Sequence, residues 1–552
     1  MKIFLNVFIK YNTFFVAIVL SIISVVSLFH PGLPPTHDGE YHVVRFYEFD
    51  KALRSGSVYP IWASDLNFTF GVPLFNYVYP LPNYIASFAH VFGSSFIDAF
   101  KFNLIAASLL GAITSYALGR QKFGKWGGLL TSVFYTYAPY HFLDIYIRGS
   151  VGEVWALAFF PLPIIFINKL LYRHNVYDQI FLGLSLGLIV FSHNILSLMY
   201  MGFIVSYVFV FAISKKTSLK GILSIGLGVL LSFLLTAIFI IPALFESKFV
   251  VGLNTFTVID HFPDLSSLLI PSWGSGYSGI SVANQMSFQI GAANIMIICI
   301  VVVTLILKKF KKEKLYVLFF LAWFLFLIFL MNPSSSFLWE SVPGMSYFQF
   351  PWRLLSLVIL ACAILAGSLA SAYTSRIFYS IVFMLAVITT YQYAHAPYFF
   401  DRQDSHYIKR SNFIHGTNSI GNGFQTKWLS QQKALPSDSS VIISGKGEIR
   451  LLEKTATYQL FEADIKSPSI VRFNTAYFPG WTVYSESSKV AVKNSSGVIE
   501  VPLRTGQQRV KLRLENTMLR KTAKLVTLFT VISVLILLAF PVLQLRYGSR
   551  FR

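Results

Sequence analysis

The stretch FFVAIVLSIISVVSLFHPGLPPTHDGEYHVVRF, residues 14–46, decides the fold. Residues 14–29 are apolar with scattered serines, close to the ~20 residues that a helix needs to cross a bilayer. Residues 30–46 then bring acids, histidines and an arginine directly after this run. The segment HPGLPPTHDG has no small-residue cleavage site. We therefore predict an uncleaved transmembrane helix followed by a polar segment outside the membrane.

The composition of the whole chain indicates an integral membrane protein. Of its 552 residues 55% are hydrophobic and 12% are charged, whereas soluble domains carry about 25% charged residues. With the first run, the apolar segments predict about 12 spans. The others lie near residues 101–119, 126–142, 153–171, 179–193, 195–213, 221–243, 290–307, 315–331, 353–373, 377–395 and 522–543.

Lysine and arginine collect on one side of this predicted topology. The basic loops are GRQKFGK, NKLLYRH, SKKTSLK and KKFKKEK, and the tail is RYGSRFR. Cytoplasmic loops retain positive charge, so we predict a multi-pass membrane protein with both termini in the cytoplasm. The segment NTMLRKTAK, residues 516–524, is the exception, because it puts three basic residues at the outer end of the last span.

The charged residues also bear on possible partners. All acidic residues except Asp178 and Glu313 fall on the predicted outer side, which places the polar chemistry there. The formal charge of +21 is spread over short loops, without a basic stripe interleaved with aromatic residues. We therefore expect no nucleic-acid partner. Cys299 and Cys362 both lie in apolar spans and predict no disulfide or metal site.

Three domains are predicted along the chain. Residues 1–395 form a polytopic transmembrane domain whose first extracytoplasmic loop covers residues 30–100. Residues 396–521 contain short runs with period-two alternation, such as ATYQLFEADI and SIVRFNTAYF, which predict an extracytoplasmic β-sandwich. Residues 522–552 form the last transmembrane helix and a cytoplasmic tail.

Polar residues from four separate regions fall at the outer ends of predicted helices. Ionisable residues at membrane depth are costly and tend to mark substrate paths, so we expect these side chains to form one site. Asp144 and Gln349 lie in the same regions. The candidate site residues are Asp38, Glu40, His42, Arg45, Arg148, Glu153, His193, Asn194 and Arg353.

Five of these residues also have a structural interpretation. Asp38 suits the N-cap of the following helix. His193 suits a hydrogen-bonded turn between two helices. Arg353 suits a side chain that extends to the lipid headgroups. Arg148 and Glu153 suit a structural ion pair at a helix start.

Helical geometry separates the two acids of the first motif. Asp38, His42 and Arg45 share one face of a helix, whereas Glu40 lies nearly opposite. Both carboxylates can face one site only if the chain around Gly39 is not yet helical, which glycine permits. We therefore expect Asp38 at the junction between the loop and the helix.

These residue types suit the transfer of a sugar from a lipid phosphate. A carboxylate, Asp38 or Glu40, would take the proton from the acceptor hydroxyl. Arg148, His193 and Arg353 would hold the departing phosphate. Alternatively, Asp38 and Glu40 with His37 or His42 would hold a divalent cation such as Mg²⁺ or Mn²⁺.

The motifs resemble a known class of enzymes. The predicted architecture resembles the GT-C superfamily of polyprenyl-phosphate-sugar-dependent glycosyltransferases. The shared features are a first outer loop that opens with an acidic motif, a large number of membrane spans, and an external domain near the C-terminal end. The chain is more closely similar to bacterial membrane proteins catalogued as 6-pyruvoyl-tetrahydropterin synthase-related, and to YfhO-like proteins. The motifs that carry this similarity are HDGEYHVVRF, DIYIRGSVGEVWALAFFPL, FSHNILSL, FQFPWRLL and AYFPGWTVYSESSKVAV. The resemblance covers nearly the whole chain, although HDGEYH lacks a strict Asp-x-Asp.

The resemblance implies a GT-C-like helical fold and a role as a membrane glycosyltransferase. Its partners would be membrane lipid, a polyprenyl-phosphate sugar donor and a glycan, lipid or protein acceptor of the cell envelope. Two other classes stay open on the sequence alone. A transporter or lipid flippase is one, because 12 spans are common among carriers, and a non-catalytic envelope assembly protein is the other.

Overall fold

The computed structural model describes residues 2–252, 257–280, 282–429 and 440–547. The chain forms two compact units that alternate along the sequence. The first unit comprises Met1–Gly39, Phe100–Ser232 and Phe256–Arg402, and the second comprises Glu40–Ala99, Phe233–Thr255 and Gln403–Arg552. The three consecutive domains, with boundaries after residues 395 and 521, stay a prediction.

The first unit is helical. Its helices begin with α1 (Lys2–Val25) and continue with α4 (Phe96–Thr136), whose first residues belong to the second unit. The others are α5 (Pro139–Phe142), α6 (Val151–Phe159), α7 (Pro161–Leu170), α8 (Val176–Ser192), α9 (Asn194–Ser214), α11 (Leu265–Leu269), α12 (Ala292–Ile306), α13 (Lys314–Leu330), α14 (Ser336–Ser341), α15 (Leu355–Ser368) and α16 (Arg376–Thr390).

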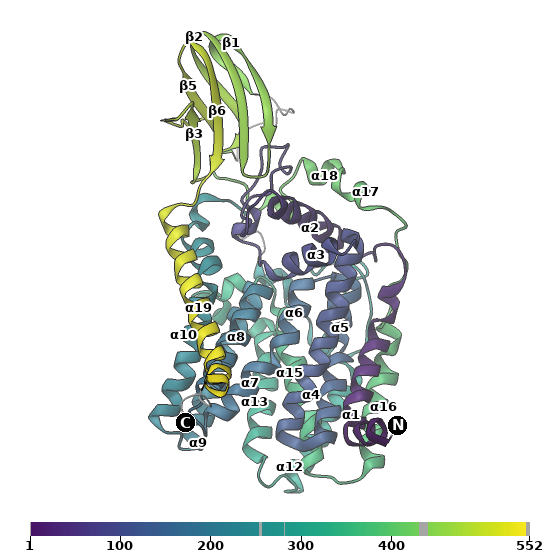
Figure 1. Ribbon diagram of the computed structural model, residues 1–552. Helices are drawn as coiled ribbons and strands as arrows, with labels where there is room; N and C mark the ends of the chain where they lie inside the picture. The colour runs from purple at the N-terminus through teal and green to yellow at the C-terminus, as the bar shows by residue number, and fades with distance from the viewer. Residues whose placement is uncertain (1, 253–256, 281, 430–439, 548–552) are drawn as a thin grey trace. The chain divides into compact units, whose positions relative to one another are not determined.

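Several of these helices are suited to a bilayer, as the composition predicts. In the described residues, seven helical segments are long and apolar enough to cross a membrane, or up to eight if α13 and α14 form one bent span. Helices α8 and α12 are apolar but shorter. Two of the predicted spans form the single 41-residue helix α4 (Figure 1), which is broken at Gly124, where φ is 77°. The presence of several spans is confirmed, and the count of about 12 stays a prediction.

The second unit combines helices with a β-sheet. Its helices are α2 (Gly39–Arg54), α3 (Leu81–Val91), α17 (Asp404–Ile408), α18 (Ser411–Ile414) and α19 (Met518–Tyr547), together with the last residues of α10 (Leu219–Phe245). The strands are β1 (Val441–Lys454), β2 (Tyr458–Ala476), β3 (Trp481–Ser485), β4 (Ser488–Val490), β5 (Val498–Leu503) and β6 (Gly506–Leu514). Of the predicted tail, residues 548–552 lie outside the described residues.

The strands confirm the predicted antiparallel β domain, but they form one sheet where a sandwich has two (Figure 1). The strand order is β1-β2-β6-β3-β4, and β5 pairs with β2. The first half of the 19-residue strand β2 pairs with β6 and its second half with β5. The segment around Trp62, Phe70 and Tyr77 packs into the apolar core of the sheet, which gives the sheet a cover without a second sheet.

Candidate active site

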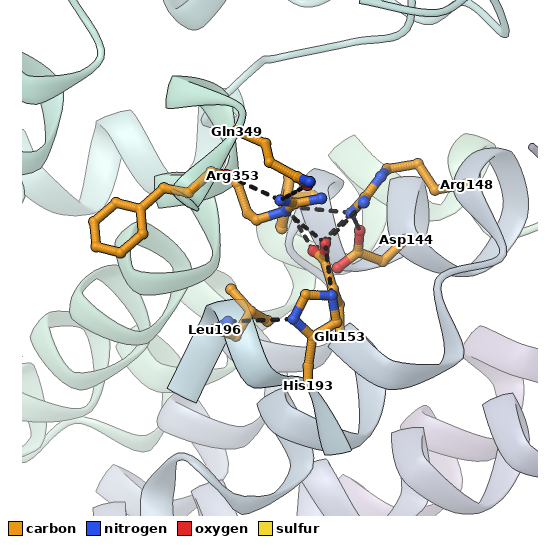
Figure 2. Close-up of polar contacts among 9 residues, drawn as sticks. Asp144, Arg148, Glu153, His193, Leu196, Gln349 and Arg353 are labelled. Atoms are coloured by element: carbon orange, nitrogen blue, oxygen red, sulfur yellow. Dashed lines mark hydrogen bonds and ion pairs between the residues drawn. The ribbon is translucent and has the colours of Figure 1, made fainter. Parts of the chain in front are cut away.

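The first unit holds a buried polar cluster built from three parts of the chain. We call Asp144, Arg148, Glu153, His193 and Arg353 the Glu153 cluster; all five side chains are buried. Asp144 and Arg148 belong to a π-helical turn, Leu143–Arg148, and such turns occur often at functional sites. Figure 2 shows how the side chains of the cluster converge on Glu153.

Glu153 lies at the centre of the cluster. It is in the first turn of α6, and its side chain is fully buried. Arg148 donates two hydrogen bonds to it, from Nη1 to Oε2 at 2.6 Å and from Nη2 to Oε1 at 2.7 Å. Arg353 donates from Nε to Oε1 at 2.8 Å, and the Tyr140 hydroxyl donates to Oε2 at 3.0 Å. Both carboxylate oxygens are therefore engaged by the protein.

His193 lies in the turn between α8 and α9. Its Nδ1 accepts a hydrogen bond from the backbone N–H of Leu196 at 3.2 Å, so His193 caps α9. A neutral imidazole whose Nδ1 accepts carries its proton on Nε2. This Nε2 lies 3.8 Å from Oε1 of Glu153, which is too long for a hydrogen bond, so His193 contacts the cluster electrostatically.

Aromatic rings cover the two arginines. The guanidinium carbon of Arg148 lies 4.8 Å from the ring centre of Trp352, and that of Arg353 lies 5.0 Å from the ring of Phe350. Nη1 of Arg353 donates to the carbonyl of Phe348 and to Oε1 of Gln349. Nη2 of Arg353 makes no hydrogen bond to any residue that the structure describes. The cluster therefore retains one guanidinium donor for another group.

The charges of the cluster depend on Asp144. Arg148 donates from Nη1 to Oδ1 of Asp144, while Oδ2 is buried without a hydrogen-bond partner among the described residues. Burial, and next the charge of Glu153, raise the pKa of the Asp144 carboxyl well above its usual range, although Arg148 opposes this. A proton on Asp144 leaves two arginines against one glutamate, and the cluster then has a net positive charge.

The segment before α2 is hydrogen-bonded to the same π-helical turn. The backbone N–H of His37 donates to the carbonyl of Ile147, and that of Asp38 to the carbonyl of Arg148, each at 2.9 Å. The close approach requires Gly149, which has φ 64°, because a Cβ there would lie 2.3 Å from Oγ1 of Thr36. The backbone of Asp38 is thereby held beside the Glu153 cluster.

Asp38 lies immediately before α2, which begins at Gly39, as its expected place at the loop-to-helix junction requires. Its side chain is partly exposed. Among the described residues, none forms a hydrogen bond or ion pair with its carboxylate. Asp38 is therefore the acid next to the cluster whose carboxylate oxygens are not engaged by any residue that the structure describes.

His37 is held by the first unit. Its Nε2 donates to the carbonyl of Ser275 at 2.8 Å, and its ring stacks on Tyr277 with centroids 4.3 Å apart. Desolvation lowers the pKa of His37, although the Ser275 carbonyl and Asp38 oppose this. The ring therefore favours its neutral form and presents Nδ1 on its other side.

Three candidates of the opening motif belong to the second unit. Glu40 is paired with Arg410, whose Nη1 lies 2.5 Å from Oε2. Arg45 donates from Nη2 to the carbonyl of Asn418, and the buried His42 packs near Phe46. These contacts give Glu40 and Arg45 roles in holding α2 to the segment of residues 410–418.

Two further predictions concern Asn194 and a metal site. Asn194 follows His193, but its side chain is exposed and shares no hydrogen bond or ion pair with the Glu153 cluster among the described residues. No group of three or more His, Cys, Asp or Glu side chains able to hold a metal is found in the part of the chain that the structure describes. A site for Mg²⁺ or Mn²⁺ at Asp38, Glu40 and His37 stays a prediction, because Glu40 belongs to the second unit and the other two residues to the first.

The sequence did not point to Tyr140, Phe350 or Trp352. Tyr140 follows Pro139 at the start of a short helix, which looks in the sequence like the end of an apolar span. Trp352 is adjacent to Arg353, and an aromatic residue beside a candidate arginine was a usable signal, because arginine binds aromatic faces. The abundance of aromatic residues, 17% of the chain, masked it.

Several solved structures resemble this chain at low sequence identity. They include the arabinofuranosyltransferase AftD from Mycobacteria (TM-score 0.46, 13% identity, 70% of this chain), the oligosaccharyltransferase of Archaeoglobus fulgidus (0.43, 12%, 73%) and ArnT from Cupriavidus metallidurans bound to undecaprenyl phosphate (0.38, 12%, 68%). The chain spans 27%, 56% and 62% of their respective lengths.

The family comparison matches the chain over most of its first three quarters. Among curated proteins no match is found. The family described as 6-pyruvoyl-tetrahydropterin synthase related domain, membrane protein, matches residues 75–396, which is more than half of the chain and includes Asp144, Arg148, Glu153, His193 and Arg353. The chain therefore belongs to the 6-pyruvoyl-tetrahydropterin synthase-related family of membrane proteins, as its motifs predict.

Proposed function

We propose that this protein is an integral membrane glycosyltransferase of the GT-C type. It transfers a sugar from a polyprenyl-phosphate-linked donor to a cell-envelope acceptor on the extracytoplasmic face of the bacterial inner membrane. The observation that carries the proposal is the Glu153 cluster, a buried set of guanidinium groups. The backbone of Asp38 is hydrogen-bonded to it, and the Asp38 carboxylate has no ion-pair partner among the described residues. A base and a cationic phosphate site are the two groups that this reaction requires.

Asp38 acts as the general base. Its carboxylate takes the proton from an acceptor hydroxyl as the hydroxyl oxygen forms a bond to the anomeric carbon of the donor sugar. The bond between that carbon and the phosphate oxygen breaks, and the polyprenyl phosphate leaves with the electron pair. Glu40 is less suited to this role, because its carboxylate is paired with Arg410.

Arg353 binds the leaving phosphate. Its Nη2 is a charged donor that the described residues leave without a hydrogen bond, and guanidinium groups suit phosphate oxygens. Glu153 holds Nε of Arg353 and both terminal nitrogens of Arg148, so it positions the two cations.

The test is sugar transfer by the full-length protein in membranes with a labelled polyprenyl-phosphate sugar. Asp38→Asn should lower the rate by about 10²–10⁴-fold, which is the range for loss of a general base. Glu40→Gln is the matched control, because it removes an acid two residues away, and we expect a much smaller loss. Full transfer by Asp38→Asn would exclude Asp38 as the base.

A further inference from the structure

The second unit contains a cavity that the proposed transfer reaction does not use. Its volume is about 550 Å³, within the range of small-molecule sites. It lies among the loop of residues 55–61, the sheet, and the adjoining ends of α10 and α19. Three cations line it, Arg513, Arg520 and Lys524, and none of its lining residues is acidic.

Arg520 is the buried cation of this cavity. It is 4% exposed, and its Nε and Nη2 lie 3.0 and 2.9 Å from Oε2 of Glu246. Asn76 and Thr517 also donate to Glu246, so that carboxylate is shared among several donors. Nη1 of Arg520 is buried without a hydrogen-bond partner among the described residues, although its residue lines the cavity.

Tyr59 also lines the cavity. The hydroxyl of Tyr59 is buried and lacks a hydrogen-bond partner among the residues that the structure describes. A buried polar group without a partner is costly, and such groups call for a water, an ion or a ligand. Two unpartnered donors and two further cations around one cavity favour an anion with several acceptor oxygens.

The cavity also accounts for the one basic segment that contradicts the charge rule of the topology. In NTMLRKTAK, residues 516–524, Arg520 and Lys524 are four residues apart and therefore share one face of α19; both line the cavity. They lie in the first turns of an apolar segment suited to a membrane, Met518–Ala539. Ile238 and Pro242 of α10 line the cavity beside them. Charges at a span end, next to apolar side chains, are suited to a lipid headgroup.

We propose that this cavity binds a phosphate group, and that the headgroup of an anionic membrane lipid supplies it. Arg520 and Lys524 bind the phosphate oxygens with Arg513, the Tyr59 hydroxyl donates to the same group, and the lipid tail lies along the α10 side. Bound lipid would join the loop of residues 55–61, the sheet and α19 within the second unit.

The test titrates full-length protein in detergent with short-chain phosphatidylglycerol, short-chain phosphatidylcholine or inorganic phosphate, and measures bound ligand by native mass spectrometry. Lys524→Gln should weaken phosphatidylglycerol binding about tenfold, as expected for loss of one charge-assisted contact. Lys521→Gln is the matched control, because Lys521 is exposed on the same helix turn and does not line the cavity. The affinity of the Lys521→Gln variant for phosphatidylglycerol should change less than twofold.

The outcomes separate the sources of the phosphate. Tighter binding of phosphatidylglycerol than of inorganic phosphate supports a lipid. Binding of inorganic phosphate alone, with the same loss in Lys524→Gln, supports a phosphate site but overturns the lipid as its source. Equal effects of Lys521→Gln and Lys524→Gln, or no binding of any of the three ligands, would overturn the site. Arg513→Gln provides a second variant at an exposed cation, so the result does not depend on one substitution.

Discussion

Replacing Glu153 by glutamine removes one buried negative charge while keeping the size of the side chain. In the native protein Glu153 accepts three hydrogen bonds from two arginines and one from Tyr140. Hydrogen bonds to charged groups contribute about 1.5–3 kcal/mol each, so losing all three arginine bonds would cost about 5–9 kcal/mol. The glutamine oxygen still accepts from one arginine, which lowers this figure.

We therefore expect Glu153→Gln to reduce the free energy of unfolding by about 3–5 kcal/mol, the range for breaking a buried ion pair by removing one partner. Arg148 retains Asp144 as a partner, whereas Nε of Arg353 faces an amide. The assay is reversible unfolding of the purified protein in mixed detergent micelles. Glu340→Gln is the matched control, because Glu340 is exposed, and exposed substitutions usually change stability by less than about 0.5 kcal/mol.

A second substitution distinguishes the ion pair from a general packing defect. If Arg353 and Glu153 form an ion pair, Arg353→Gln should lower the free energy of unfolding less in the Glu153→Gln variant than in the native protein, because the partner of Arg353 is already absent. Additive losses from the two substitutions, or a Glu153→Gln variant as stable as the native protein, would refute the reasoning.

Two further predictions concern Glu48 and Gly149. Burial, and next the charge of Asp65, raise the pKa of the Glu48 carboxyl from 4.5 to about 8. The native state therefore binds a proton that the unfolded state has lost, and stability should fall as the pH rises from about 4.5 to about 8, by at most about 5 kcal/mol at 1.36 kcal/mol per pKa unit. Glu48→Gln should flatten the profile of melting temperature against pH between 5 and 9, and an unchanged slope would contradict this. Gly149→Ala should lower the melting temperature and sugar transfer together, because its Cβ would lie 2.3 Å from Oγ1 of Thr36 at a positive φ that costs about 1–2 kcal/mol. Thr36→Ala in the same protein should restore part of both, and no recovery would argue against this contact.

The fold could be predicted from the sequence where the signal is local. Apolar runs identified the helices, and period-two alternation identified the strands of residues 441–514, because both patterns follow from which face of an element is buried. The single sheet could not be predicted, because the pairing of β2 with both β5 and β6 depends on partners up to about 50 residues away. The cover supplied by Trp62 comes from a segment about 400 residues earlier in the chain.

The site was predictable to the level of residue type. Arg148, Glu153, His193 and Arg353 were chosen because ionisable groups are costly near a bilayer, and the structure brings these four together. Their mutual pairing was less evident. The sequence suggested that the arginines bind phosphate and left an ion pair as an alternative, but in the structure Glu153 accepts three hydrogen bonds from them. A spacing of 200 residues between Glu153 and Arg353 gives no local signal of such a contact.

The choice between Asp38 and Glu40 depends on their partners more than on their spacing. Both acids lie beside Gly39, and helix geometry separates their directions without saying which of them is free. Arg410 lies 370 residues from Glu40 in the sequence, and its guanidinium forms an ion pair with that carboxylate. The backbone of Asp38 is instead tied to Arg148 while its side chain is left unpaired among the described residues. We therefore propose Asp38 as the base, because its backbone is held in place and its carboxylate is not neutralised by an ion pair to any residue that the structure describes.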